Sequence, residues 1–122
     1  MDHDSFKAWL DLYSKAWTER NPELIRDLFA QDAKYLEKPF SAPFDGVYSI
    51  TQYWQGVVQT QKDVSFQYKI LAVNQDLGIA HFAASFLRNQ TTQIKLDGIF
   101  LVKLNSQNKC TRFEEWWQSQ KN

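Results

Sequence analysis

Residues 64–73 read VSFQYKILAV, and here the spacing of apolar side chains along the chain changes. Before this stretch, apolar residues recur every three or four positions, as on one face of a helix. From it onward, residues 64–73, 78–89, 91–105 and 109–117 form four long runs rich in β-branched and aromatic side chains, with turn-like segments between them. Strands joined by short loops pair antiparallel. We therefore predict an α+β domain with its helices on one face of a curved sheet.

The half before residue 64 predicts three helices and one short strand. Asp4 or Ser5 caps a first helix, whose buried stripe consists of Phe6, Trp9, Leu10, Tyr13, Ala16 and Trp17. Asn21 followed by Pro22 begins a second helix. Residues 33–38 read as a strand, and helical spacing returns at residues 50–58 after a loop marked by Pro39, Pro43, Asp45 and Gly46.

Length and composition exclude several classes of protein. A chain of 122 residues makes a single domain, which we place at residues 1–122. Lys plus Arg and Asp plus Glu both number 14, so the basic stripe of a nucleic-acid or anionic-membrane binder is missing. No basic and apolar leader begins the chain and no apolar run is long enough to span a bilayer, so we expect a cytoplasmic protein. Aromatic residues make up 16%, which favours an aromatic-lined cavity.

The order of elements and several local sequences carry a family resemblance. Asp32-Ala33 before the short strand, the loop Pro43-Phe44-Asp45-Gly46, and Tyr53-Trp54 in the third helix are its main marks, with Pro39 and Ile50. The chain resembles the SnoaL-like and ketosteroid isomerase-like branch of the nuclear transport factor 2-like superfamily. The resemblance implies the cystatin-like cone of that superfamily, with three N-terminal helices on a strongly curved, mainly antiparallel mixed sheet. It also implies a small hydrophobic ligand, no cofactor and a homodimer.

The resemblance to bacterial steroid isomerases assigns roles to single residues. Tyr13 matches the tyrosine of those enzymes that donates a hydrogen bond to the oxyanion, and Glu37 matches their general base. The third catalytic position holds Phe100, so the full oxyanion hole is missing. Asp97 alternates to the opposite face of its strand unless Gly98 forms a bulge.

Alternation in the same comparison predicts which strand residues face the cavity. These are His81, Ala83, Ser85 and Leu87 in the second run, Gly98, Phe100 and Val102 in the third, and Phe113, Glu115 and Trp117 in the last. We expect the substrate-binding residues to be Trp9, Trp17, Tyr35, Phe44, Trp54, Ser85, Phe100, Phe113, Glu115 and Trp117, and the catalytic residues to be Glu37, Tyr13 and His81.

Each candidate also has a structural explanation. Walls of Tyr35, Trp54 and Trp117 would desolvate Glu37, raising its pKa toward neutrality; alternatively, it is a rim residue paired with Lys34 or Lys38. Tyr13 either donates into the cavity or packs in the core with its hydroxyl satisfied at the edge. His81 either exchanges protons beside a glutamate or is a satisfied polar group of an inner strand.

Other site chemistries find no support. His3, His81 and Cys110 lack the spacing of a zinc site, so we expect no metal. Cys110 reads as a buried small residue, and the four glycines form no phosphate loop. Trp116 alternates to the outer sheet surface, where it would anchor the dimer.

Two classes of function stay open. The first is cofactor-independent isomerase, cyclase or dehydratase chemistry on a hydrophobic ring compound. In it Glu37 moves the proton, His81 assists and Tyr13 steadies negative charge on an oxygen. The second is a non-catalytic ligand-binding or dimeric interaction module, in which Glu37, His81 and Glu115 form a structural polar cluster.

Overall fold

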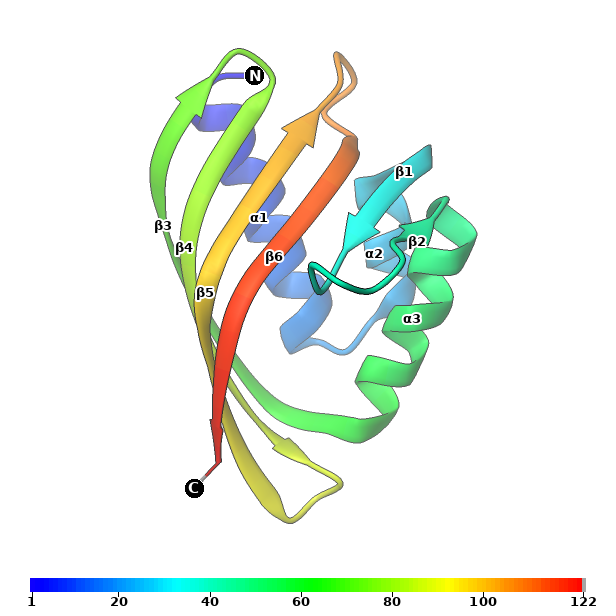
Figure 1. The fold of residues 1–122 in the computed structure, drawn as a ribbon, viewed down its shortest axis with the longest axis vertical. Helices are drawn as coiled ribbons and strands as arrows, with labels where there is room; N and C mark the ends of the chain where they lie inside the picture. Colours follow the sequence, from blue (N-terminus) through cyan, green and yellow to red (C-terminus); the bar gives the residue numbers. More distant parts are fainter. Residues whose placement is uncertain (122) are drawn as a thin grey trace.

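A computed structural model describes residues 1–121, in which three helices lie against one face of a long, curled sheet (Figure 1). The elements in chain order are α1 (His3–Thr18), α2 (Pro22–Leu28), β1 (Phe29–Leu36), β2 (Phe44–Asp45), α3 (Val47–Thr60), β3 (Gln61–Asn74), β4 (Leu77–Arg88), β5 (Thr92–Leu104) and β6 (Cys110–Lys121). No helix in this range is long and apolar enough to cross a membrane.

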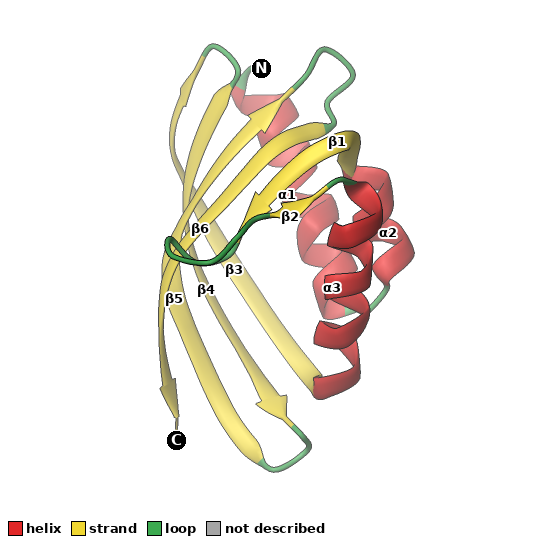
Figure 2. Ribbon diagram, turned by 45° about the vertical axis from the view of Figure 1, so that its right-hand side comes forward, coloured by secondary structure: helices red, strands yellow, loops and turns green. Residues whose placement is uncertain are grey.

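The six strands form one mixed sheet in the order β2-β1-β6-β5-β4-β3. Among the strands of residues 1–121, β1 and β6 pair in parallel and the other neighbouring pairs are antiparallel. The long strands curve and extend beyond the helices at the lower end of Figure 2, where α3 passes directly into β3. The predicted α+β fold, with three helices on a curved mixed sheet, is confirmed.

Local sequence explains where the helices begin. Asn21 caps α2 with Pro22 at its first position, as predicted, and the Asn21 side chain accepts from the amide of Glu23. Helix α1 begins earlier than predicted, because Asp2 and Ser5 form a reciprocal capping box. Helix α3 follows Gly46, whose φ of 89° suits glycine at this sharp entry.

The core is unusually aromatic and centres on Tyr13. Its ring stacks on Trp9 and Phe113, with centroids 5.4 Å away in both cases, and it meets Phe100 edge-on at 5.4 Å. Phe6, at the other end of the α1 stripe, packs against Gly78 at the start of β4. The aromatic side chains therefore fill the cone toward the start of β4 and leave open space toward its end.

Gly98 allows β5 and β6 to approach closely. A Cβ atom at this position would lie 2.1 Å from the backbone oxygen of Trp116 and 2.8 Å from Cα of Trp117. The pairing of β5 with its neighbours continues without a register shift at Gly98, so the bulge that would turn Asp97 inward is absent. Gly98 serves close strand packing, and Asp97 points to the outer face.

Candidate functional site

A cavity of about 430 Å³ lies between α3 and the inner face of the sheet. Its walls are mainly aromatic and aliphatic, and they come from the end of α1, from α3 and from five strands. The end of α3 and the turn between β4 and β5 form its rim in the lower part of Figure 2. A concave, largely apolar space with a few polar groups is the usual form of a small-molecule site.

Two carboxyl groups, of Glu37 and Glu115, share one wall of this cavity. Leu36, the last residue of β1, pairs with Glu114 in β6. Glu37 directly follows β1 and Glu115 is the next residue of β6, and both line the cavity. Both carboxyl residues also border a second hollow of about 380 Å³ beneath residues 38–41. The carboxyl pair therefore lies between two spaces.

Glu115 carries a perturbed carboxyl group. Burial, opposed by a hydrogen bond from Tyr35 and supported by the nearby charge of Glu37, raises its pKa from 4.5 to about 8. The Tyr35 hydroxyl donates that bond to Glu115 Oε1 over 2.9 Å. At neutral pH Glu115 is therefore mostly protonated and is able to donate a proton.

Tyr53 completes the polar wall. Burial raises the pKa of its hydroxyl, and the negative charges of Glu115 and Glu37 add to the effect. Its ring stacks on Phe44 with centroids 4.4 Å apart, which fixes it against the start of α3. Tyr53 therefore stays a neutral hydroxyl beside the two carboxyl groups.

The opposite rim carries nitrogen donors. Gln61 pairs with Arg88 where β3 begins and β4 ends, and both residues line the cavity with Asn89. Gln61 Oε1 accepts a hydrogen bond of 2.8 Å from Trp17 Nε1, which turns the Gln61 amide nitrogen away from that contact. The buried Nε1 of Trp54, also a lining residue, has no hydrogen-bond partner among residues 1–121.

Six of the residues predicted for the site line this cavity. They are Trp17, Tyr35, Glu37, Trp54, Glu115 and Trp117. Glu37 forms no ion pair with another described residue: Lys34 instead binds Asp45 at 3.0 Å, and Lys38 Nζ lies 5.7 Å from the Trp117 ring centre. Glu37 is thus not paired with Lys34 or Lys38, as the alternative interpretation required. Its role as a base stays a prediction.

Tyr13 does not line the cavity, contrary to expectation. It is fully buried between Trp9 and Phe113, and its hydroxyl has no hydrogen-bond partner within the described chain. Burial and then the charge of Glu115 raise the pKa of this hydroxyl well above 10. Trp9, Phe100 and Phe113 belong to the same core, and Phe44 packs behind Tyr53, so none of these four lines the cavity either.

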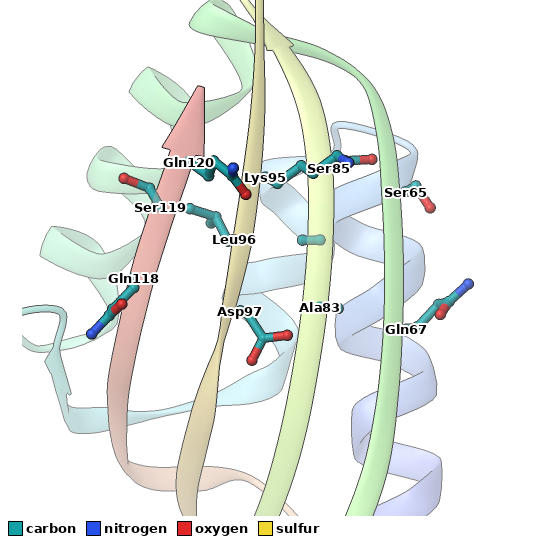
Figure 3. A pocket seen from close by; sticks show the side chains of 11 residues that line it. Ser65, Gln67, Ala83, Ser85, Lys95, Leu96, Asp97, Gln118, Ser119 and Gln120 are labelled. Carbon is teal, nitrogen blue, oxygen red and sulfur yellow. The ribbon is translucent and has the colours of Figure 1, made fainter. Parts of the chain in front are cut away.

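The prediction that His81 and Ser85 face the cavity is wrong. On β4 the buried residues are Gly78, Ala80, Phe82, Ala84 and Phe86, so His81, Ala83, Ser85 and Leu87 lie on the outer face. His81 Nε2 lies 2.8 Å from Asp97 Oδ1 there, with both side chains partly exposed. Figure 3 shows Ser85 and Asp97 on the face of the sheet opposite the helices.

The error has a simple origin in strand geometry. An offset of one residue between β4 and the matching strand of the isomerases turns every side chain of the strand to the other face. The sizes of the side chains in β4 indicate which face is buried, because the large apolar rings of Phe82 and Phe86 need a covered face and the small Ala83 and Ser85 do not. Side-chain size therefore predicts that Phe86 and Arg88 face the helices, and both residues line the cavity.

The described part of the chain offers no cluster for a metal ion. No three His, Cys, Asp or Glu side chains within residues 1–121 come together in a way that could hold one. Cys110 is buried, and burial raises the pKa of its thiol. The chemistry available at the site is therefore that of carboxyl, hydroxyl and nitrogen donor groups.

Comparisons with known proteins agree with this fold. The family model of the SnoaL-like domain matches residues 9–113. A computationally designed 17-OHP binder has a TM-score of 0.82 at 10% identity, with 93% of this chain and 95% of that chain covered. A putative scytalone dehydratase from Novosphingobium aromaticivorans has a TM-score of 0.81 at 16% identity, covering 96% and 85%.

A third solved structure is SalBIII, an epoxide hydrolase/cyclase-like enzyme of pyran ring formation in the polyether salinomycin. It has a TM-score of 0.81 at 18% identity, with 96% of this chain and 93% of that chain covered. A search of curated proteins finds no match. At these identities, the structural likeness concerns the fold.

Proposed function

Because the chain belongs to the SnoaL-like domain family, we propose that its cavity binds a small hydrophobic ring compound and moves a proton on it. The observation that carries the proposal is the Tyr35–Glu115 contact of 2.9 Å in an aromatic cavity that Glu37 shares. A protonated carboxyl group and a second carboxyl group in one cavity are the parts of an acid and base pair. The folds of a dehydratase and a cyclase-like enzyme resemble this one, which supports the choice of chemistry.

In this proposal each side chain has a distinct task. Glu115 donates its proton to a carbonyl or leaving oxygen, and Glu37 removes a proton from the adjacent carbon. The Tyr35 hydroxyl steadies the Glu115 carboxylate left after donation, because its hydrogen bond favours the charged form. Trp17, Trp54 and Trp117 hold the ring, and the transfers need no cofactor.

A deuterium-exchange assay tests the chemistry without knowledge of the natural substrate. 2-Tetralone, a bicyclic ketone with acidic CH₂ groups, is incubated with the protein in D₂O, and loss of its α-proton signals is followed by ¹H NMR. We expect faster exchange than in buffer, a loss of about 10²-fold or more in Glu37→Gln, and a smaller loss in Glu115→Gln. Glu114→Gln, which alters the neighbouring carboxyl group that pairs with Arg112 at 3.1 Å, is the matched control.

Binding without exchange would instead favour the non-catalytic alternative. If 2-tetralone binds, as seen by quenching of tryptophan fluorescence, but exchange never exceeds the buffer rate with this ketone or with larger ring ketones, proton transfer is rejected. The cavity would then be a ligand-binding site, and the Tyr35–Glu115 contact a structural one.

We also propose that the outer sheet face pairs with a second copy of the chain. No helix among residues 1–121 covers this face (Figure 2), where Trp116 is 50% exposed and lies across from Ile99. A groove on the same face carries both Lys95 and Asp97 (Figure 3). A face with charges of both signs complements itself across a two-fold axis, and an exposed Trp is a typical interface anchor.

The mass in solution tests this arrangement. Light scattering after gel filtration should give twice the chain mass, and Trp116→Asp should shift the protein to the monomer. Leu12→Asp on α1 is the matched control, because Leu12 is 51% exposed but lies on a helix. A monomeric wild type, or a dimer that survives Trp116→Asp, would reject the outer face as the interface.

A further inference from the structure

The cavity has two chemically different ends. The carboxyl groups of Glu37 and Glu115 lie beside β1 and β6, whereas Arg88, Gln61 and Asn89 lie where β3 begins and β4 ends. Glu115 lies level with Ala80 of β4, through the pairs Glu115–Phe100 and Phe100–Ala80, whereas Arg88 lies at the last position of β4. The two groups are therefore separated along the length of the strands. A ligand that spans the cavity meets acidic groups at one end and nitrogen donors at the other.

Arg88 is a free cation at its end of the cavity. It forms no ion pair and no side-chain hydrogen bond with any residue in the range 1–121. Its guanidinium carbon lies 5.7 Å from the centre of the Phe86 ring, which lines the same cavity. Stacking over an aromatic ring holds the planar guanidinium and leaves its N–H groups for an outside acceptor.

Three other donor groups of the cavity lining also have no acceptor among residues 1–121. The Gln61 amide oxygen is used by Trp17, so its NH₂ group is the part left for a ligand. Asn89 adds a second amide, on a left-handed turn residue with φ of 51°. Trp54, only 2% exposed, also lines the cavity, and its buried Nε1–H has no partner among residues 1–121.

From this arrangement we propose that the ligand is a ring compound that carries an anionic group, such as a carboxylate, bound by Arg88 at the cavity mouth. The anion binds the guanidinium in a bidentate manner, the ring lies against the tryptophans, and the reacting carbon and oxygen reach the carboxyl pair. At the other end, the negative charge of Glu37 disfavours an anion. The inference rests on the proposed ligand-binding function and adds the chemical class of the ligand.

Two fluorescent probes with the same ring system separate the two proposals. 8-Anilino-1-naphthalenesulfonate is anionic, and N-phenyl-1-naphthylamine is its neutral counterpart. Titration of the folded protein with each gives two dissociation constants. We expect Arg88→Gln to weaken binding of the anionic probe by about 10-fold and to change binding of the neutral probe by less than about twofold. The affinity of Arg88→Lys for the anionic probe should lie between those of wild type and Arg88→Gln, since lysine keeps the positive charge but loses the bidentate guanidinium.

Arg26→Gln on α2 is the matched control, because it removes an exposed guanidinium that does not line the cavity. If neither probe binds wild type, the proposed ligand-binding function fails. If both probes bind wild type, and Arg88→Gln weakens the binding of the two probes equally or leaves both unchanged, the cavity binds ring compounds but the anion site at Arg88 is rejected. If Arg26→Gln weakens the anionic probe as much as Arg88→Gln does, the effect is one of net charge and the site is rejected too.

Discussion

The Tyr35 hydroxyl donates a hydrogen bond of 2.9 Å to Glu115 Oε1, and it does so from a strand that runs parallel to the one carrying Glu115. Residue Tyr35 pairs with Phe113, so the two side chains approach along one face of the β1 and β6 pair. This contact connects the short strand of the helical half to the last strand of the sheet. It also lowers the pKa of the Glu115 carboxyl group, against the larger, opposite effect of desolvation.

Tyr35→Phe should raise the pKa of Glu115 above its value of about 8. The hydrogen bond from Tyr35 stabilises the carboxylate form, so its removal favours the protonated form, by about one pH unit. ¹³C NMR of the glutamate side-chain carboxyl carbons, followed from pH 5 to pH 10, measures the shift. Tyr48→Phe, at an exposed tyrosine of α3, is the control and should leave the titration unchanged. A Glu115 pKa that stays or falls in Tyr35→Phe would contradict this account of the contact.

Glu115→Gln should stabilise the protein at pH 8 by on the order of 2–4 kcal/mol and have little effect at pH 4. The pKa of Glu115 is higher in the folded chain, about 8, than its ordinary value of 4.5. Between these values the folded state holds a proton that the unfolded state has released, so the free energy of unfolding falls as the pH rises. Glutamine cannot ionise, and its amide oxygen still accepts from Tyr35.

Urea unfolding at pH 4, 6 and 8 checks this dependence, and Glu114→Gln is the neighbouring control. The wild type should lose stability from pH 4 to pH 8 relative to Glu115→Gln. Parallel pH profiles for the two proteins would show that the carboxyl group is not strongly perturbed.

Tyr13→Phe should raise the free energy of unfolding by about 1 kcal/mol and leave ligand binding unchanged. The Tyr13 hydroxyl is buried without a partner in the described chain, and a buried unsatisfied group destabilises the folded state. Thermal unfolding and titration with N-phenyl-1-naphthylamine measure the two effects. The oxyanion role implied by the family resemblance makes the opposite prediction, because loss of a donor would slow α-proton exchange on 2-tetralone by about 10²-fold or more.

Gly98→Ala should destabilise the fold by on the order of 2–4 kcal/mol, since its Cβ would lie 2.1 Å from the Trp116 carbonyl oxygen. The matched variant is Gly56→Ala in α3, where an added Cβ has no neighbour within 4 Å. That change should stabilise the helix by about 0.5–1 kcal/mol, because alanine loses less backbone freedom than glycine. Urea unfolding of both variants tests the contrast, and equal effects of the two substitutions would refute it.

Much of the fold was predictable because local signals decide it. The Asn21-Pro22 pair begins α2, and the change of apolar spacing before Val64 separates the helical half from the long strands. The predicted start of α3 was late, since Gly46 and Val47 begin it before the apolar spacing is visible. Six predicted side chains line the cavity, and the inward residues of β6 were predicted correctly because Phe113 and Trp117 flank Glu115 at period two.

By itself, the sequence determined the class of fold, the order of the elements and the presence of carboxyl groups among aromatic residues. Only the tertiary structure decided that Glu115 carries the raised pKa, that Tyr13 is a core residue, and that His81 pairs with Asp97 on the outer face. The reason is physical. Helix caps and the spacing of apolar residues depend on a few neighbouring positions in the sequence. Which face of a strand is buried depends instead on its register with adjacent strands, and the pKa of a side chain depends on the groups that packing brings close to it.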